Sequence, residues 1–267
     1  MILLFVTFLG NVYRDVLSSA VPEGLEISKS LTEGFVGGWL FSSLLAVSCV
    51  TVAFCSNMLS VADKMTGARN DIDVSPVKKY VPALSYFAAS ALSTLIICYV
   101  ALGVCFIYLS IVGFYLSLAD ILFTILDVLL LVLFGTALSS IINHFLSTQG
   151  QISAVGTIVS SCYGFISGAY MPLSQFGSGI QTLVSFLPST YGTALLHHHL
   201  MRGTYAELES AGLPAPVIEG IRGAFDGNPE FFGTIIDPWL MYLVLGGSIA
   251  LLIGIYVLLS VKETKKK

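Results

Sequence analysis

The run "ILFTILDVLLLVLFGTALSSII" (residues 121–142) holds a single charged side chain, that of Asp127, among apolar and small residues. About 20 helical residues cross the roughly 30 Å hydrocarbon layer of a bilayer. In lipid, a segment of this length satisfies its backbone polar groups only as a helix. The run therefore predicts a membrane-spanning helix.

Four further apolar runs have a similar length: residues 34–58, 84–112, 152–170 and 240–261. Hydrophobic residues make up 55% of the chain and charged residues only 10%, and the mean hydropathy is +0.88. Since a soluble domain carries about 25% charged residues, this composition predicts an all-α polytopic membrane protein. The net charge of −4 comes with no basic patch, so we expect no nucleic-acid partner. No CxxC pair joins the five cysteines, so we expect no metal or redox centre.

The chain opens with a shorter apolar run, "MILLFVTFLG" (residues 1–10). We interpret it as the outer half of a first span whose beginning is missing, which makes six transmembrane helices. A signal peptide is the alternative, because "SSA" at 18–20 resembles a cleavage site. That alternative lacks the positively charged start of a signal peptide.

Lysine and arginine residues indicate the orientation, because they gather in cytoplasmic loops. Eight of the twelve fall in residues 62–80 and in the C-terminal tail: Lys64, Arg69, Lys78, Lys79, Lys262, Lys265, Lys266 and Lys267. We therefore expect both termini and the 62–80 loop to be cytoplasmic. No internal repeat is visible, which weakens a secondary-transporter interpretation.

The region between the last two runs, about residues 171–239, then lies outside. Its first part stays apolar, with Ile180, Leu183, Val184 and Leu187 at helical spacing. This pattern predicts a re-entrant or interfacial helical hairpin, and the break at Gly168 and Pro172 is where the preceding span ends. After Arg202 the composition changes to that of a small external segment.

Three stretches together resemble the permease subunit of ABC transporters of the type 2 exporter class. They are "DKMTGARNDIDVSPVKK" (63–79), "SGAYMPLSQF" (167–176) and "FLPSTYGTALLHHHLMRG" (186–203). They are similar to the family's charged-x-x-Gly…Ser-Pro-Val loop, its Ser-Gly-aromatic-Pro-Leu-Ser turn and its Leu-Pro-x-Thr-Tyr segment. With their order and the predicted topology, the resemblance covers nearly the whole chain as one transmembrane domain, residues 1–267. The family's usual N-terminal amphipathic helix is not present ahead of the first run.

The resemblance implies a permease that pairs with a second copy or a close homologue in the plasma membrane of a bacterial cell. Two cytoplasmic ATP-binding subunits would bind ATP and Mg and drive export of an amphipathic drug, lipid, peptide or glycan. This chain would bind no cofactor and would not be an enzyme itself, and it contains no G-x-x-x-x-G-K-[ST] phosphate loop. The alternatives are a stand-alone ion- or proton-coupled secondary transporter and an intramembrane enzyme.

The resemblance places the helix that couples to the ATPase within residues 62–80. The residues expected there are Asp63, Gly67, Arg69, Asp71, Ile72, Asp73, Ser75 and Pro76. The candidate residues of the transport pathway are Asp127, Tyr170 and Met171. An acid inside a span costs about 2.5–3.5 kcal/mol on insertion scales, so Asp127 is expected to face protein or water. It would contact substrate or a cation in the pathway, or else bond to a neighbouring serine or threonine.

Small residues recur every four positions on the run 152–170: Gly156, Ser160, Gly164 and Gly168. Such a stripe lets two helix backbones approach closely, and we expect it to pack within or between subunits. The histidines at 197–199 invite a metal site, but consecutive helical residues point about 100° apart and cannot converge on one ion. We interpret them as polar residues of an interfacial helix.

Overall fold

The computed structural model describes residues 10, 11, 14, 17, 28–78, 80–225, 230–231 and 234–266. Within these residues the chain is almost entirely helical, with one short strand pair, β1 (Glu230–Phe231) and β2 (Thr234–Ile235). The predicted all-α fold is confirmed. Nearly all of the opening run, residues 1–10, lies outside the described residues, so the first span stays a prediction.

Four helices of the described part are long and apolar enough to cross a membrane. They are Lys29–Thr66, which comprises α3 (Lys29–Ser56) and α4 (Met58–Thr66), then α6 (Val81–Val112), α7 (Leu118–His144) and the Pro238–Lys262 part of α12 (Pro238–Lys266). Each covers one predicted run. The run 152–170 forms the shorter helix α8 (Gln149–Ile166), which is not among the four. The predicted count of six spans is therefore not reached by length and composition alone.

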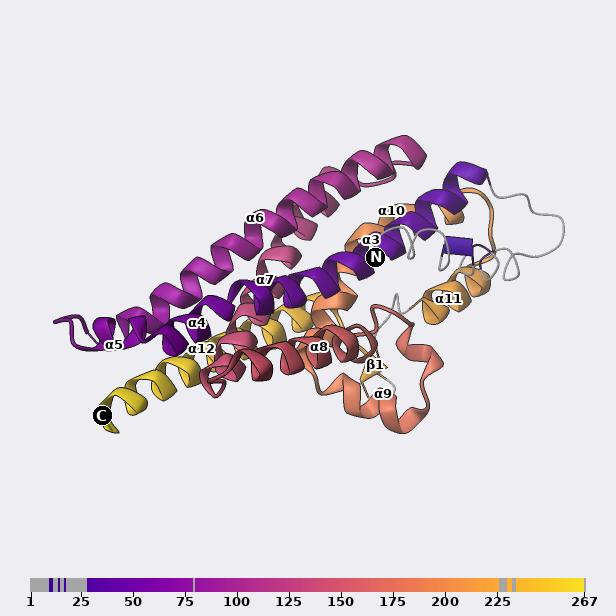
Figure 1. The fold of residues 1–267 in the computed structure, drawn as a ribbon. Helices are drawn as coiled ribbons and strands as arrows, with labels where there is room; N and C mark the ends of the chain where they lie inside the picture. The colour runs from indigo at the N-terminus through magenta and orange to yellow at the C-terminus, as the bar shows by residue number, and fades with distance from the viewer. Residues whose placement is uncertain are drawn as a thin grey trace.

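Helix α3 is the centre of the bundle, and α6, α7, α8 and α10 pack around it (Figure 1). Close approach is possible where α7 carries Gly135, since a Cβ there would lie 2.9 Å from the Cα of Val50 on α3. The outer face of α6 instead exposes a row of branched apolar residues, among them Val100, Ile107 and Ile111. A bare apolar row of this kind on a bundle surface is typical of contact with lipid.

The chain leaves α8 through Gly168, which has a φ of +77° and so takes the left-handed conformation that ends many helices. The elements that follow are η2 (Leu173–Gln175), α9 (Ser178–Ser185), α10 (Pro188–Ser210) and α11 (Ala215–Ala224). Helix α10 continues eight residues past Arg202, so the residues expected to form a small external segment begin as the last turns of this helix, and their position outside stays a prediction. The polar residues after Arg202 did not end the helix because one face, with Tyr205 and Leu208, stays buried.

Helix α10 starts deep in the bundle and ends near the beginning of α3. At its start, a Cβ on Gly192 would lie 2.7 Å from Cγ of Leu131, which is halfway along α7. Toward its end, Tyr205 and Leu208 share an apolar cluster with Phe35 of α3. The α10 helix therefore spans about half of the bundle's length.

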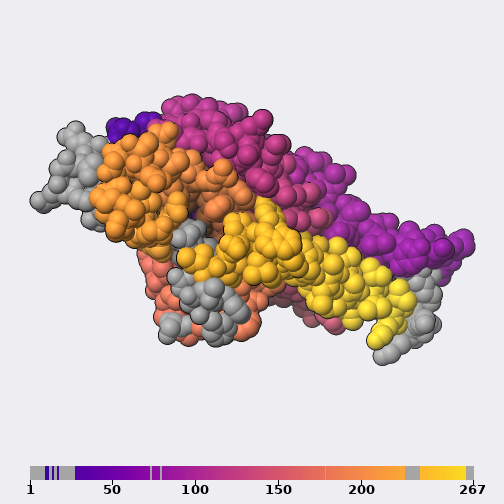
Figure 2. Space-filling view, turned by 180° about the vertical axis from the view of Figure 1, so that it is seen from behind, coloured from indigo at the N-terminus to yellow at the C-terminus, as the bar shows by residue number. Residues whose placement is uncertain are grey.

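The two ends of the bundle carry different elements. The ribbon places α5 (Ala68–Asp73) and the C-terminal end of α12 at one end, and α11 at the other (Figure 1). From behind, α12 runs over the surface toward the same end as the purple segment around residue 75 (Figure 2). Residues 62–78 and the C-terminal end of α12 thus lie at the same end of the molecule.

Candidate functional site: an α4–α5 arm and buried polar contacts

Helices α4 and α5 form a bent arm beyond the bundle. The bend is at Gly67, whose φ of +85° is the left-handed conformation that glycine adopts without steric cost. The arm and the turn after it, residues 58–77, bring together the predicted coupling residues Asp63, Gly67, Arg69, Asp71, Ile72, Asp73, Ser75 and Pro76. These residues are continuous in sequence, so the structure adds their shape, a helix–glycine–helix elbow.

Two sets of side-chain contacts fasten the arm to neighbouring helices, one to α6 and one to α7. The hydroxyl of Tyr86 on α6 donates to Oδ2 of Asp63, and the guanidinium of Arg69 lies 5.6 Å from the centre of the same ring. The ammonium of Lys64 donates to the carbonyl oxygen of His144 at 2.6 Å, at the C-terminal end of α7. A cation is favourable at that end of a helix because the free carbonyls carry negative partial charge. The arm is thus held to both α6 and α7.

An apolar cavity of about 380 Å³ lies between the arm and the start of α6. Its lining residues are Leu59, Ile72, Val77, Val81, Pro82, Ser85, Tyr86 and Ala89. Beside it, Val74 at the tip of the arm is 84% exposed and Leu59 is 58% exposed. Exposed apolar side chains gathered around a hollow are typical of a protein interaction site.

A third set of contacts joins the arm to the bundle at Asn57, between α3 and α4. Its side chain is fully buried, and Nδ2 donates to the hydroxyls of Ser139 at 3.1 Å and Ser140 at 2.7 Å on α7. Its Oδ1 accepts from the hydroxyl of Ser90 on α6 at 3.3 Å. Sequence reasoning missed this group. Its signal was a single asparagine near the end of the apolar run 34–58.

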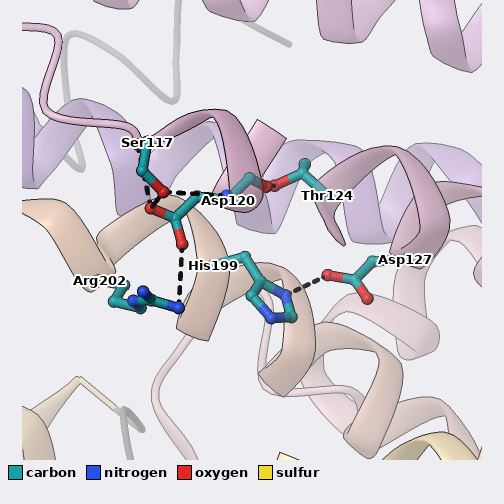
Figure 3. A network of polar contacts seen from close by, with 6 residues as sticks. All are labelled: Ser117, Asp120, Thr124, Asp127, His199 and Arg202. Carbon is teal, nitrogen blue, oxygen red and sulfur yellow. Dashed lines mark hydrogen bonds and ion pairs between the residues drawn. The ribbon is translucent and has the colours of Figure 1, made fainter. Parts of the chain in front are cut away.

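The acid in the middle of α7, Asp127, is fully buried and uses both carboxyl oxygens. Its Oδ2 lies 2.6 Å from Nδ1 of His199 on α10 (Figure 3). Its Oδ1 accepts from the hydroxyl of Tyr242 on α12. The ring of Phe123 stacks on the imidazole with centres 5.0 Å apart. The interpretation of a bond to serine or threonine is therefore wrong. Sequence reasoning missed His199 and Tyr242 as the partners.

A second polar contact joins α7 and α10 nearer the start of α7. Asp120 forms a capping box with Ser117, and Arg202 reaches to 3.4 Å from Oδ1 of Asp120 (Figure 3). Asp120 lies about two turns before Asp127 on α7, while Arg202 follows His199 by about one turn on α10. The two antiparallel helices are therefore linked at two levels.

The adjacent histidines turn to different helices, as their helical positions predict. His197 lies 3.0 Å from the hydroxyl of Ser43 and stacks on Trp39, both on α3. His199 faces Asp127 on α7. Both imidazoles are buried, so the interpretation of α10 as an interfacial helix is wrong for this part of it. In the described part of the chain, no three His, Cys, Asp or Glu side chains gather closely enough for a metal.

The small-residue stripe on α8 has an unexpected neighbour. A Cβ on Gly164 would overlap the ring of Tyr170, and the Tyr170 N–H donates to the Gly164 carbonyl at 2.9 Å. Gly164 therefore makes room for an aromatic ring from its own turn. Gly156 and Ser160 are half-buried, and packing of the stripe between subunits stays a prediction.

The three candidate pathway residues lie at two different places. Asp127 is tied to α10 and α12, whereas Tyr170 packs on α8 and Met171 follows it, half-buried, in the same turn. A contact of any of them with substrate stays a prediction.

Comparison with known families gives a match over most of this structure. Residues 18–256 match the family described as ABC-2 family transporter protein. No curated protein matches the chain. The matched range includes the α4–α5 arm, the buried contacts of α7 with α10, and all but the last turns of α12. The chain therefore belongs to the ABC-2 family of transporters, as a multipass permease subunit.

Proposed function

We propose that this chain is the permease of an ATP-driven exporter and that the α4–α5 arm receives the movement of a separate ATP-binding subunit. The proposal rests on the protrusion of the arm and on its exposed apolar surface. The continuous segment Lys29–Thr66 has 38 residues, about 57 Å at helical rise, well beyond a hydrocarbon layer of roughly 30 Å. One end of it must protrude, and the protruding end that bears the arm also exposes apolar side chains beside a cavity.

The distribution of charge supports a cytoplasmic position for the arm. Lys64, Arg69 and Lys78 lie on or next to it, and the C-terminal end of α12 with its lysines lies at the same end of the molecule. Basic residues next to spans favour the cytoplasmic side. With the opening run as the first span and α8 as the fifth, the chain would cross six times and have both termini inside the cell.

The segment from α9 to the start of α10 would be the re-entrant element. Gly192, at the start of α10, packs against Leu131 midway along α7, a span of 27 residues. A chain that begins a helix at that depth and returns to the end from which it came crosses only part of a bilayer. Backbone breaks at such a depth are tolerated when they are buried in protein. The C-terminal end of α10, and α11 after it, would then face the outside.

Export would require a second permease beside this one. Helix α8 exposes Ile158 and Phe165, at 60% and 52%, on a helix that carries the small residues Gly156 and Ser160. We place the partner permease against this face, with the transported amphipathic molecule passing between the two. Two ATP-binding subunits would then contact the two arms.

The test is transport by the complex reconstituted in lipid vesicles with its ATP-binding subunit. Gly67→Pro, or charge reversal at Asp71 and Asp73, should abolish substrate-stimulated ATPase activity while the permease still inserts, because each change disrupts the elbow or its surface. Glu209→Lys, at the far end of α10, serves as the matched charge reversal and should leave stimulation intact. Full stimulation in all arm variants would reject the arm as the coupling site.

A stand-alone proton-coupled transporter is the second candidate, and the buried contacts of Asp127 favour it. A carboxyl group bonded to an imidazole and a phenol inside a membrane is a typical proton-relay composition. In vesicles without nucleotide, a pH gradient would then drive uptake, and Asp127→Asn would abolish it. We expect no gradient-driven transport, because Asp120 is the one further buried acid of the described residues, and its carboxylate is already engaged by Ser117 and Arg202.

A further inference from the structure

The α4–α5 arm meets the bundle at a buried polar junction around Asn57. Helix α3 ends at Ser56 and α4 begins at Met58, so this residue stands at the only interruption within the 38-residue segment Lys29–Thr66. Its carbonyl oxygen accepts both the N–H and the hydroxyl of Ser60, at 3.3 and 2.9 Å. The backbone is therefore bonded locally across the interruption, and the rod stays continuous.

The side chain of Asn57 connects this rod to two other helices at once. The amide nitrogen donates to Ser139 and Ser140 on α7, and the amide oxygen accepts from Ser90 on α6. Thr94, one turn beyond Ser90, adds a bond from α6 to the hydroxyl of Ser56 at 3.2 Å. Each of these side chains is buried or partly buried. If one of these bonds is removed, water therefore does not replace it as it would at a surface.

The two outer contacts of the arm complete the geometry. Asp63 is held by Tyr86 of α6, and Lys64 is held by the end of α7. The same two helices that hold the middle of α4 are thus joined to the root of the arm at Asn57. Helices α3, α6 and α7 all continue from here toward the far end of the bundle, so a tilt of the arm about Asn57 would act on all three.

We propose that Asn57 is the positioning residue that transmits movement of the arm into α6 and α7, an inference that rests on the proposed function of the arm. Its amide is suited to this because it donates toward one helix and accepts from another through one planar group. The bonds keep the three helices in register, so a displacement at Gly67 reaches the outer end of the bundle. Without them, only the contacts of Asp63 with Tyr86 and of Lys64 with the end of α7 still join the arm to these helices, and its movement no longer reaches their far ends.

The experiment uses the full complex with its ATP-binding subunit in lipid nanodiscs, in a background in which the five native cysteines are replaced. One spin-label pair, at Met65 and Phe145, reports the arm against the end of α7. A second pair, at Leu118 and Glu209, reports the far end. All four positions are exposed. Nucleotide binding should change both distances in the parent protein.

With Asn57→Ala we expect the arm pair to respond to nucleotide as before and the far pair to lose its response. Substrate stimulation of ATPase activity should fall by about tenfold, within the usual range of coupling between sites, while basal activity persists. Asn57→Asp keeps the size and the acceptor for Ser90 and should retain part of the response. Ser42→Ala is the matched control, since Ser42 is equally buried on α3 but bonds only to the carbonyl of Trp39 at 2.8 Å.

Several results would overturn the inference. A normal far-end response in Asn57→Ala, with Gly67→Pro uncoupled, rejects Asn57 and leaves the arm in its role. If Gly67→Pro also keeps normal stimulation, the proposed function of the arm fails and this inference with it. If Asn57→Ala does not fold, Ser90→Ala and the pair Ser139→Ala with Ser140→Ala cut the two sides of the junction separately. Normal coupling in both then rejects the inference.

Discussion

At the scale of single residues, the few polar groups inside the bundle determine which helices must stay together. Asp127 is the clearest case, because its two oxygens are bonded to side chains of two other helices, His199 on α10 and Tyr242 on α12. A buried acceptor that loses its partner costs about 1–3 kcal/mol, and more when charged. Such a group therefore stabilises one arrangement of α7, α10 and α12 against its alternatives.

His199→Ala should lower the free energy of unfolding by at least about 1–3 kcal/mol, because it leaves Oδ2 of Asp127 without its partner. Thermal unfolding of the purified permease in detergent measures this. His198→Ala removes the neighbouring, half-buried imidazole and should have a smaller effect.

A triple variant separates this cause from a general loss of packing. Replacing the acid and both partners by apolar residues, Asp127→Leu, His199→Leu and Tyr242→Phe, removes the unsatisfied groups together. Such a replacement can be close to neutral. A triple variant as unstable as His199→Ala would show that the polar contacts are not what the single change disrupts.

At the scale of helices, glycine and other small residues set how closely the elements approach. On α7, Gly135 faces the backbone of Val50 and Cys49 on α3, with no room for a methyl group. On α6, Gly103 has no atom within 4 Å of the corresponding position. Glycine is thus required for close packing at Gly135 of α7, but not at Gly103 of α6.

We expect Gly135→Ala to lower the free energy of unfolding by about 1–3 kcal/mol, because α7 must move away from α3. Gly103→Ala should be neutral or stabilising by roughly 0.5–1 kcal/mol, since alanine is the better helix former and nothing obstructs its methyl group. Unfolding of the two variants under the same conditions gives the comparison. Equal effects would contradict the packing assigned to Gly135.

The stripe on α8 gives a second prediction at this scale. Gly164→Ala should destabilise the turn after α8, and Tyr170→Leu should relieve that effect, because the new methyl group would overlap the tyrosine ring. A double-mutant cycle should show a coupling of about 0.5–3 kcal/mol between the two changes. Gly156→Ala, with only the methyl of Met58 nearby at 3.7 Å, is the control. Additive effects would mean that Gly164 faces another helix or subunit instead.

The main helices could be predicted from sequence, and their partners could not. The apolar runs at 84–112, 121–142 and 240–261 each became a helix within a few residues of the predicted ends, because length and apolarity act locally. The course of α10 was predicted less well. Its polar residues, from His197 to Arg202, were expected at a surface, but most of that stretch is buried by contacts with α3 and α7 that composition does not encode.

The same holds for the candidate site: its consecutive residues were predicted from the sequence, and their partners on other helices were not. The residues of the 62–80 segment were predicted because they are consecutive and charged between two apolar runs. Tyr86 and His144, which fasten the arm, lie outside that segment and were missed. The partners of Asp127 lie about 70 to 115 positions away along the chain, and those of Asn57 about 30 to 80 positions away. A single sequence carries no signal for such pairings.

At the scale of the whole molecule, the structure has two unlike ends. One carries the arm, the apolar cavity and the C-terminal end of α12, and the other carries α11 and the end of α10. We propose that the first end lies in the cytoplasm. A cysteine at Lys64 should therefore react with a membrane-impermeant reagent only from the inside, and one at Glu209 only from the outside. Reversed labelling would invert the orientation and remove the arm from reach of a cytoplasmic ATPase.

The most direct test of the central claim asks what touches the tip of the arm. A photo-crosslinking amino acid at Val74, the 84% exposed residue of the tip, would be activated in intact cells, with Leu118 at the far end, 74% exposed, as the control. We predict that Val74 is crosslinked to a subunit that binds ATP and carries a phosphate loop, and that Leu118 is not. Crosslinking of that subunit from Leu118 but not from Val74 would contradict the account.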